Sequence, residues 1–387
     1  MFHQALRVET RIRLSRTAII EMAAVRCVRA ARMQARTQPK SRRTTRPTQL
    51  GTPLAQRRPI PLARRFRRGS FKEAIMSTMR AYRIHGFGGP EVLKAEDIEI
   101  PEPGAGEVLV RVGAASANPV DLKTRAGQYP LIREDKLPYT LGRDFSGVVE
   151  RAGGGVTQWH AGDGVYGFVG QGQGAYAQFV VVAAAALARR PRHVDAVTAG
   201  AVPLAALTAW QGLFDHGKLE AGGRVLIHAG AGGVGHFAVQ FAKQHGAQVF
   251  ATASGDGIEF VRSLGADRVI DYHAQRFEDV ARDMDLVFDL IGGDTQRRSW
   301  AAVASGGALI STLTEPSQTE ASKHGARAAR YTARPDGRQL AEIAALINHG
   351  SVRVAVAERF AFDALAKALE RLAKGHVRGK LVVEVAQ

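Results

Sequence analysis

An eleven-residue segment constrains the fold of this chain more than any other feature. Residues 225–235 read VLIHAGAGGVG, a short apolar strand that ends in the pattern G-x-G-x-x-G. The residues that follow, Phe237, Ala238, Phe241 and Ala242, have the spacing of one apolar helix face. A strand, a glycine-rich turn and a helix in this order are typical of sites that bind the pyrophosphate of a dinucleotide.

Each residue of the glycine motif has an expected role. Gly230 permits the tight turn, Gly232 lets the backbone approach the pyrophosphate, and Gly235 lets the helix pack close to the strand. Gly233 and Val234 complete the turn, and the helix offers unpaired N–H groups and a positive dipole end to the phosphates. Because glycine-rich turns are common, a strand–helix connection without a ligand is the alternative interpretation.

The downstream sequence favours nucleotide binding. Further strands are predicted at 248–254, 268–272, 286–291 and 308–313, with helical segments at 258–264, 277–283 and 295–304 between them. Alternating strands and helices predict a parallel sheet with right-handed crossovers. We therefore predict an α/β fold with a doubly wound parallel sheet of the Rossmann type.

The charge of the chain is concentrated at one end. Residues 1–78 contain 19 Lys or Arg and 3 acidic residues, whereas the rest contains 34 and 33, so the net charge of +17 arises almost wholly from this segment. It could be a targeting peptide, a nucleic-acid-binding arm, or an extension from a wrongly assigned start codon. We favour the last, because Met76 and Met79 stand directly before a patterned strand, and we expect disorder in each case.

Cysteine content and hydropathy exclude several classes. The only cysteine is Cys27, so residues 79–387 can form neither a disulfide bond nor a thiolate zinc site. No apolar run reaches the length that spans a bilayer. The near-neutral remainder does not suggest a nucleic-acid or membrane partner. We expect a cytoplasmic protein, or an organellar one if residues 1–78 are a genuine targeting segment.

The sequence predicts a second domain in two pieces. Short alternating strands between Gly and Pro clusters indicate a β-rich domain at 79–202. The nucleotide-binding domain is expected at 203–325. Residues 326–387 are expected to return to the first domain, with helices at 337–348 and 363–374, an extended run at 352–362 and a strand at 380–385. The polar stretch 314–334 receives no assignment.

From Met79 to Gln387 the chain resembles the medium-chain dehydrogenase/reductases, in their zinc-free quinone oxidoreductase branch. The segments that carry the resemblance are GFGGPEVL at 86–93, SANPVD at 116–121, LGRDFSGVV at 141–149, GDGVYG at 162–167, PLAALTAW at 203–210, the glycine motif, and GKLV at 379–382. The resemblance implies a Rossmann domain inserted in a GroES-like catalytic domain, an active site in the cleft between them, and a homodimer.

The zinc-binding relatives hold a catalytic metal with Cys, His and Cys or Asp side chains. In this sequence the first of these positions falls near Asn118, and the His position is Arg143. Arginine stays protonated and cannot ligate a metal, so we expect no metal site and no alcohol dehydrogenation, which needs a Lewis acid. Arg143 and Asp144 are expected to form a structural ion pair or to anchor a loop.

Three residues are candidates for the catalytic chemistry. Asn118 could donate a hydrogen bond to a substrate oxygen or bond the local backbone. Asp121 could orient the site or stabilise a helix N-terminus. Tyr129 could donate a proton or cover the pocket. By resemblance, Thr208 lies near the nicotinamide and Lys380 reaches the cofactor or the cleft; packing and a solvated strand end are the respective alternatives.

The end of the second Rossmann strand predicts the coenzyme. This strand ends at Ser254 without the acidic residue that binds the ribose of NAD. Ser254 suits a 2′-phosphate, and Tyr272 aligns with a tyrosine that lines the adenosine phosphate site in related reductases. Arg262 could add positive charge, whereas Asp256 would repel a phosphate. We predict NADP(H).

The leading hypothesis is a zinc-independent oxidoreductase that transfers hydride from NADPH to quinones or α,β-unsaturated carbonyl compounds (enones). Because the sequence offers no strong acid–base constellation, an NADP-binding redox sensor or structural protein with little turnover is the alternative. A nucleic-acid-binding role rests on residues 1–78 alone.

Overall fold

The computed structural model describes residues 77–172 and 174–385. Cys27 and nearly all of the basic segment 1–78 therefore lie outside the described residues, and so do the expectations attached to them. Within these ranges the chain forms sheets of seven, six and three strands. None of the helices described there is both long and apolar enough to cross a membrane.

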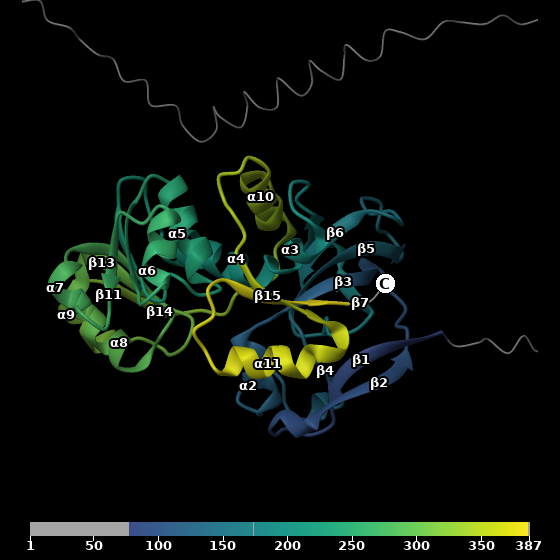
Figure 1. Cartoon of the computed structure of the whole chain (residues 1–387). Helices are drawn as coiled ribbons and strands as arrows, with labels where there is room; N and C mark the ends of the chain where they lie inside the picture. The colour runs from purple at the N-terminus through teal and green to yellow at the C-terminus, as the bar shows by residue number, and fades with distance from the viewer. Residues whose placement is uncertain (1–76, 173, 386–387) are drawn as a thin grey trace, which may run out of the picture. The chain divides into compact units, whose positions relative to one another are not determined.

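The seven-stranded sheet combines the early and the final strands of the described chain. Its order is β15-β16-β3-β5-β6-β8, with β7 paired to β3, and only β15 and β16 run parallel. The strands are β3 (Glu107–Ala117), β5 (Asp144–Ala152), β6 (Gly164–Phe168), β7 (Phe179–Ala183), β8 (Leu187–Arg189), β15 (Val356–Ala361) and β16 (Lys380–Glu384). In Figure 1 the yellow C-terminal elements lie among the blue strands, so the chain end returns to the first domain.

Alternation along β3 builds the core of this domain. Val108, Val110 and Val112 point into one apolar cluster, because side chains two residues apart lie on the same face of a strand. Helix α11 (Leu365–Ala373) adds Leu365 and Leu369, one helical turn apart, to the same cluster. The smaller antiparallel sheet has the order β2-β1-β4 and comprises β1 (Thr78–Ile84), β2 (Leu93–Glu99) and β4 (Tyr139–Thr140).

The six-stranded sheet confirms the predicted doubly wound fold. All its pairs are parallel, and its order is β11-β10-β9-β12-β13-β14. Because β9 lies between β10 and β12, the strand order reverses beside it, as in dinucleotide-binding sheets. The strands are β9 (Arg224–Ile227), β10 (Gln248–Ala253), β11 (Arg268–Asp271), β12 (Met284–Asp289), β13 (Val303–Ser311) and β14 (Arg327–Arg330).

Helices cover both faces of this sheet. Val225 and Ile227 of β9 enter one apolar core and Leu226 enters the other, so the strand is buried on both sides. Besides α11, the α-helices of the described residues are α2 (Pro119–Arg125), α3 (Ala196–Gly200), α4 (Pro203–Trp210), α5 (Gly235–Gln244), α6 (Gly257–Ser263), α7 (Phe277–Val280), α8 (Gly293–Arg298), α9 (Gln318–Lys323) and α10 (Gly337–Asn348). Of these, α2 belongs to the first domain, and α3 and α4 lead from it into the second.

Two sequence-based boundaries differ from the structure. The domain boundary expected at residue 325 falls one strand too early, because β14 pairs with β13 in the six-stranded sheet. Helix α10 has the predicted bounds, but Leu340 and Ile343 pack into the core of the Rossmann domain. The helix expected at 295–304 divides into α8 and a 3₁₀ turn (Ser299–Ala302), since β13 already begins at Val303.

Candidate functional site

The candidate site is built around the turn between β9 and α5. Ala229 has a φ of 53°, the left-handed conformation that residues with a Cβ adopt at a cost. The positive φ therefore falls on Ala229 and not on Gly230, contrary to the role expected of that glycine. A Cβ on Gly230 would lie 3.0 Å from Cβ of Ala251 and 3.3 Å from Val261. Gly230 thus lets the turn pack against the neighbouring strand and helix.

The other glycines of the motif face different neighbours. A Cβ on Gly235 would lie 2.1 Å from the carbonyl oxygen of Ala229, so helix α5 can begin this close to the strand only with glycine. At Gly232 the Ala229 carbonyl oxygen, at 3.3 Å, would be the one atom within 4 Å of a Cβ, and the residue borders the cavity described below. At Gly233 the Cβ would meet Cδ of Lys380 at 3.0 Å. Val234 stands at the N-cap of α5.

The end of β10 holds this turn in place. The Thr252 hydroxyl accepts a hydrogen bond from the Ala229 N–H (3.1 Å), and the Thr252 carbonyl accepts one from the Gly230 N–H (2.9 Å). His228 lies between the hydroxyls of Thr252 (3.3 Å) and Ser299 (2.9 Å). Burial lowers the pKa of His228 to about 4, so its ring is neutral at neutral pH and supports the turn as a buried, hydrogen-bonded residue.

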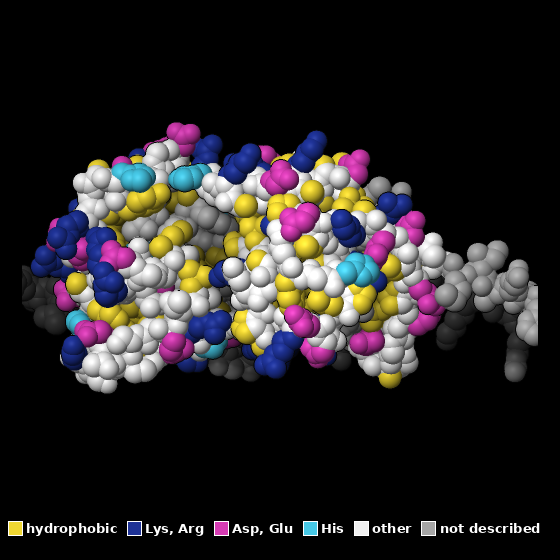
Figure 2. All heavy atoms as spheres, turned by 90° about the horizontal axis from the view of Figure 1, so that it is seen from below, with side chains coloured by type: hydrophobic (Ala, Val, Ile, Leu, Met, Phe, Trp, Pro, Cys, Tyr) yellow, Lys and Arg dark blue, Asp and Glu magenta, His cyan; other side chains and the backbone are white. Residues whose placement is uncertain are grey.

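A cavity of about 760 Å³ opens beside the turn. It lies at the carboxyl ends of β9, β10 and β11, the edge at which doubly wound sheets bind ligands. Gly232, Ser254 and Tyr272 are the predicted cofactor residues that line it. The Ser254 hydroxyl donates to the Tyr272 hydroxyl at 2.7 Å. Figure 2 also shows a hollow between the parts that carry the two large sheets, with hydrophobic side chains on its walls.

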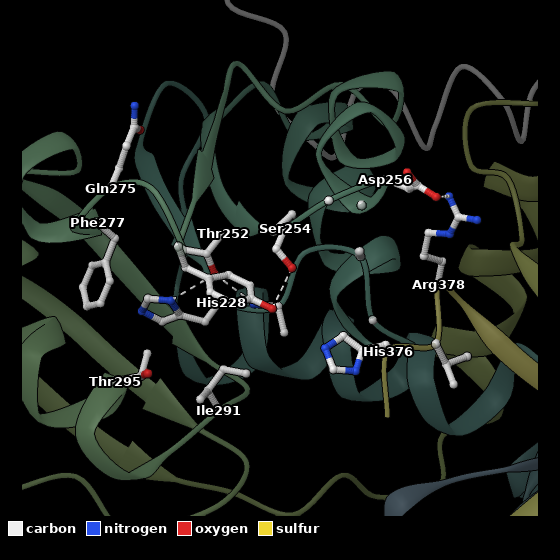
Figure 3. Close-up of a pocket in the computed structure, with 18 of the residues that line it drawn as sticks. His228, Thr252, Ser254, Asp256, Gln275, Phe277, Ile291, Thr295, His376 and Arg378 are labelled. Carbon is white, nitrogen blue, oxygen red and sulfur yellow. Dashed lines mark hydrogen bonds and ion pairs between the residues drawn. The ribbon is translucent and has the colours of Figure 1, made fainter. Parts of the chain in front are cut away.

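The charges around the cavity differ from those expected from the sequence. Arg378, from the segment before β16, lines the cavity and lies 3.6 Å from Asp256 (Figure 3). Arg298 also lines it but is bound to both oxygens of Glu278. Arg262 pairs with Glu259 on the exposed side of α6 and does not line the cavity.

Sequence reasoning missed the residues that the returning chain contributes. Residues 376–378 line the cavity although they lie more than a hundred positions beyond the glycine motif. The only local signal was their position directly before the segment GKLV. Their proximity to the turn depends on the tertiary hydrogen bond from the Gly379 N–H to the Ala231 carbonyl, at 2.9 Å.

The predicted catalytic residues Asn118 and Asp121 lie in a buried polar network. The Asn118 side-chain amide donates to the Ser116 carbonyl (3.0 Å) and to Asp144 (3.1 Å), so both of its hydrogens are used within the protein. The Asp121 carboxylate accepts from the Asn118 N–H (2.9 Å) at the start of α2 and from the Tyr176 hydroxyl (2.7 Å). Burial raises the pKa of Asp121 to about 6.

Lys380 joins this network to the glycine turn. Its ammonium donates to the Ala117 carbonyl at 3.1 Å and to the Asn118 side-chain oxygen. The side chain is 3% exposed, so the alternative of a solvated strand end is wrong. Burial lowers the pKa of Lys380, and the nearby Asp144 carboxylate opposes this shift. Burial in turn raises the pKa of Asp144, which Lys380 opposes.

Arg143 and Tyr129 lie together at one side of the network. The Arg143 guanidinium is stacked 5.0 Å from the Tyr129 ring centre and donates to the Gly170 carbonyl. Arg143 therefore anchors a loop, which was one of the two expectations. Among the described residues it forms no ion pair with Asp144, which was the other. Its Nη2 atom is buried without a partner within the same ranges. Tyr129 is half-buried, and its hydroxyl has no hydrogen-bond partner in the described part of the chain.

Thr208 occupies a packed position in α4. Its hydroxyl donates to the Leu204 carbonyl at 2.7 Å, and its own carbonyl accepts from the Tyr331 hydroxyl. Thr208 does not line the cavity beside the glycine turn. In residues 77–172 and 174–385, no group of three or more His, Cys, Asp or Glu side chains is arranged to bind a metal ion.

Comparisons with known families match both domains. A model described as the alcohol dehydrogenase GroES-like domain matches residues 104–192, and one described as a zinc-binding dehydrogenase matches residues 264–383. The chain is 35% identical over 325 residues to the chloroplastic NADPH-dependent alkenal/one oxidoreductase of Arabidopsis thaliana. The aligned region covers 80% of each chain.

Solved structures show the same similarity. The quinone oxidoreductase from Coxiella burnetii superposes with a TM-score of 0.75 at 34% identity and covers 80% of this chain and 100% of its own. The mycobacterial protein Rv1454c, solved in complex with NADPH, gives a TM-score of 0.72 at 30% identity over 79% of this chain and 100% of its own.

The close approach at Gly235 predicts a stability defect. Gly235→Ala places a Cβ against the Ala229 carbonyl, and we expect it to lower the free energy of unfolding by about 3 kcal/mol. Gly154→Ala is the matched control, because nothing lies within 4 Å of that position, and it should change stability by less than about 0.5 kcal/mol. Denaturant unfolding measures both. Equal stability of the two variants would contradict the assigned role.

The neutral state of His228 predicts a pH effect on stability. The ordinary pKa of 6.5 in the unfolded chain exceeds the folded value of about 4, so protonation favours unfolding below about pH 6.5 and has no effect above it. From about pH 7.5 to about pH 5, His228 should cost the native state up to about 2 kcal/mol.

Comparing slopes isolates this residue from other titrating groups. The unfolding free energy of His228→Gln should fall less steeply with decreasing pH than that of the unaltered protein. The opposite contribution of Asp121 is common to both proteins and cancels in the difference. Parallel slopes would show that His228 does not titrate as assigned.

Proposed function

The chain belongs to the quinone oxidoreductase branch of the medium-chain dehydrogenase/reductase superfamily, and from this membership we propose that it uses NADPH to reduce quinones or α,β-unsaturated carbonyl compounds without a metal. The cavity at the carboxyl edge of the six-stranded sheet carries the proposal. It joins the glycine turn to a serine, a tyrosine and an arginine, a combination suited to a phosphorylated dinucleotide.

The turn and the cavity fit the proposed coenzyme. The pyrophosphate would be held by the turn residues Gly230, Gly232, Gly233, Val234 and Gly235. Gly232 borders the cavity and has no side chain to block a ligand, and α5 begins directly behind the turn. We assign Thr208 and Lys380 to the nicotinamide side of the site by family resemblance. When bound, NADPH supplies the hydride, and the protein supplies position and polarity.

The preference for NADP(H) follows from the charges at the adenosine end. Ser254 and Tyr272 offer hydroxyl groups, and no acidic side chain follows β10 directly. Asp256, the residue that argued against a phosphate, is paired with Arg378. Arg298 is held by two hydrogen bonds to the buried Glu278, whereas Arg378 makes only an exposed ion pair at 3.6 Å. Arg378 is therefore the side chain that we propose to contact the 2′-phosphate.

Metal-independent chemistry follows from the residues near the expected metal position. Asn118 and Arg143 stand there, and neither offers the donor set of a zinc site. Asn118 and Asp121 would act as positioning residues, because their polar atoms bond to Lys380, Tyr176 and the backbone. Tyr129 would deliver the proton, since its hydroxyl has no partner among the described residues; solvent is the other source.

Assembly and location stay predictions. A homodimer is expected by resemblance, and β14 is the outer strand of the six-stranded sheet, so it offers one backbone edge for pairing. The cytoplasmic location remains an expectation, with an organellar one as its alternative. The proposed substrates are small molecules.

A reductase assay tests the proposed function. The protein and NADPH are mixed with quinones and with α,β-unsaturated aldehydes and ketones, and the loss of NADPH absorbance is followed, with saturated aldehydes as controls. We expect turnover of the conjugated acceptors alone, and the same rate after treatment with a chelator. Tight NADPH binding without turnover would instead support the sensor or structural role, and loss of activity with the chelator would contradict metal independence.

Arg378 tests the coenzyme assignment separately. Arg378→Ala removes a charge-assisted contact to the 2′-phosphate, so KM for NADPH should rise about tenfold or more while KM for NADH stays unchanged. Arg262→Ala is the matched control, because Arg262 is exposed on α6 and does not line the cavity. An equal change for the two coenzymes would exclude Arg378 as the phosphate ligand.

A further inference from the structure

A second groove lies on a part of the protein that the proposed reaction does not use. It has a volume of about 920 Å³ and shares no residue with the cavity beside the glycine turn. One wall is α10, which Figure 1 shows beside the region of β6, and the other is formed by residues 184–193 around β8. Its volume lies in the range of sites for small organic ligands.

The walls of the groove combine small apolar side chains with polar and basic ones. Arg338, Ala341, Ala345 and Asn348 of α10 line it, and their spacing of three or four residues places them on one face of the helix. Across the groove lie Trp159, Leu187 and several alanines. The Trp159 indole N–H donates to the Ala184 carbonyl at 3.0 Å, which fixes the ring in the wall.

The ionisable groups that line the groove are all basic. They are four arginines and two histidines, with no acidic residue among the lining side chains: Arg189, Arg190, Arg192, Arg338, His193 and His349. Arg189 is bound to Asp163 and stacks on Trp159. Within residues 77–172 and 174–385, the side chains of Arg190, Arg192 and Arg338 have no hydrogen-bond or ion-pair partner.

The fold fixes the backbone that carries the exposed side chains of Arg192 and Arg338. The side-chain oxygen of Asn348, on α10, accepts hydrogen bonds from the N–H groups of Arg192 (2.8 Å) and His193 (3.4 Å). The backbone that carries Arg192 is therefore held against the helix that carries Arg338. Two guanidinium groups without an ion-pair partner among the described residues therefore line the same groove as Leu187 and the alanines. Such groups recognise carboxylate or phosphate oxygens with two parallel hydrogen bonds.

We propose that this groove binds an amphiphilic anion, an apolar chain that ends in a carboxylate or phosphate. The apolar lining residues, Trp159, Leu187 and the alanines, would contact the apolar tail of this ligand. Arg192 and Arg338 would hold its headgroup. Charge complementarity favours an anion, because the lining contains four arginines and no acidic side chain. The proposal is independent of the reaction assigned to the other cavity.

Trp159 provides the readout. Dodecyl phosphate and dodecanoate are titrated below their micellar concentrations into the full chain, and tryptophan fluorescence is recorded together with calorimetric heat. We expect saturable binding of both, a spectral change that Trp159→Phe abolishes, and little binding of dodecyltrimethylammonium. The two anionic probes distinguish a phosphate from a carboxylate headgroup.

Matched variants separate the headgroup from the chain. Arg192→Glu with Arg338→Glu should weaken dodecyl phosphate binding about tenfold or more, whereas Arg282→Glu, a charge reversal at an exposed arginine before β12, should not. Ala341→Phe places a large side chain in the groove. It should weaken binding of dodecyl phosphate without affecting binding of inorganic phosphate.

Several outcomes would overturn the proposal. These are equal binding of the cationic amphiphile, inorganic phosphate binding as tightly as dodecyl phosphate, and binding unaffected by both groove variants. Binding of a polyglutamate peptide alone, with the same arginine dependence, would instead make the groove a protein-docking surface. NADPH oxidation by the variants reports separately on the other cavity, so failure here leaves the proposed function standing.

Discussion

The contact between the last strand and the glycine turn is the interaction on which the site depends. The Gly379 N–H donates to the Ala231 carbonyl at 2.9 Å. The next residue, Lys380, passes Gly233 and reaches the Asn118 side chain. Two adjacent residues thus tie the turn of the Rossmann domain to the first domain. Residues 376–378 immediately precede this contact, so it also places Arg378 in the cavity wall.

Much of the fold could be predicted because the central strands are buried on both faces. Such strands are continuous apolar runs with clear ends, and β9 to β12 lie within a few residues of their predicted bounds. Strand β14 escaped prediction because it is an edge strand that begins and ends with Arg327 and Arg330, so its sequence lacks that signal. Helix α10 was predicted by its period, but periodicity does not name the domain it packs against.

The site was predictable where its chemistry is local. The glycine motif, Ser254 and Tyr272 follow from strand ends and a turn, and the last two meet at 2.7 Å. Arg378 could not be found in this way, because its place depends on a return of the chain. The role of Asn118 was equally inaccessible, since its side-chain oxygen is bound by Lys380, 262 residues further along.

The network around Asn118 contains three buried ionisable groups. Asp121, Asp144 and Lys380 are all at least 97% buried, and isolated charges at that depth are strongly unfavourable. Their hydrogen bonds compensate this burial, and moving Asn118 to bind a substrate would remove one hydrogen bond from Lys380 and one from Asp144. Chemistry at this position must then use groups outside the network. Tyr129, half-buried and stacked on Arg143, is such a group, and its hydroxyl has no hydrogen-bond partner among the described residues.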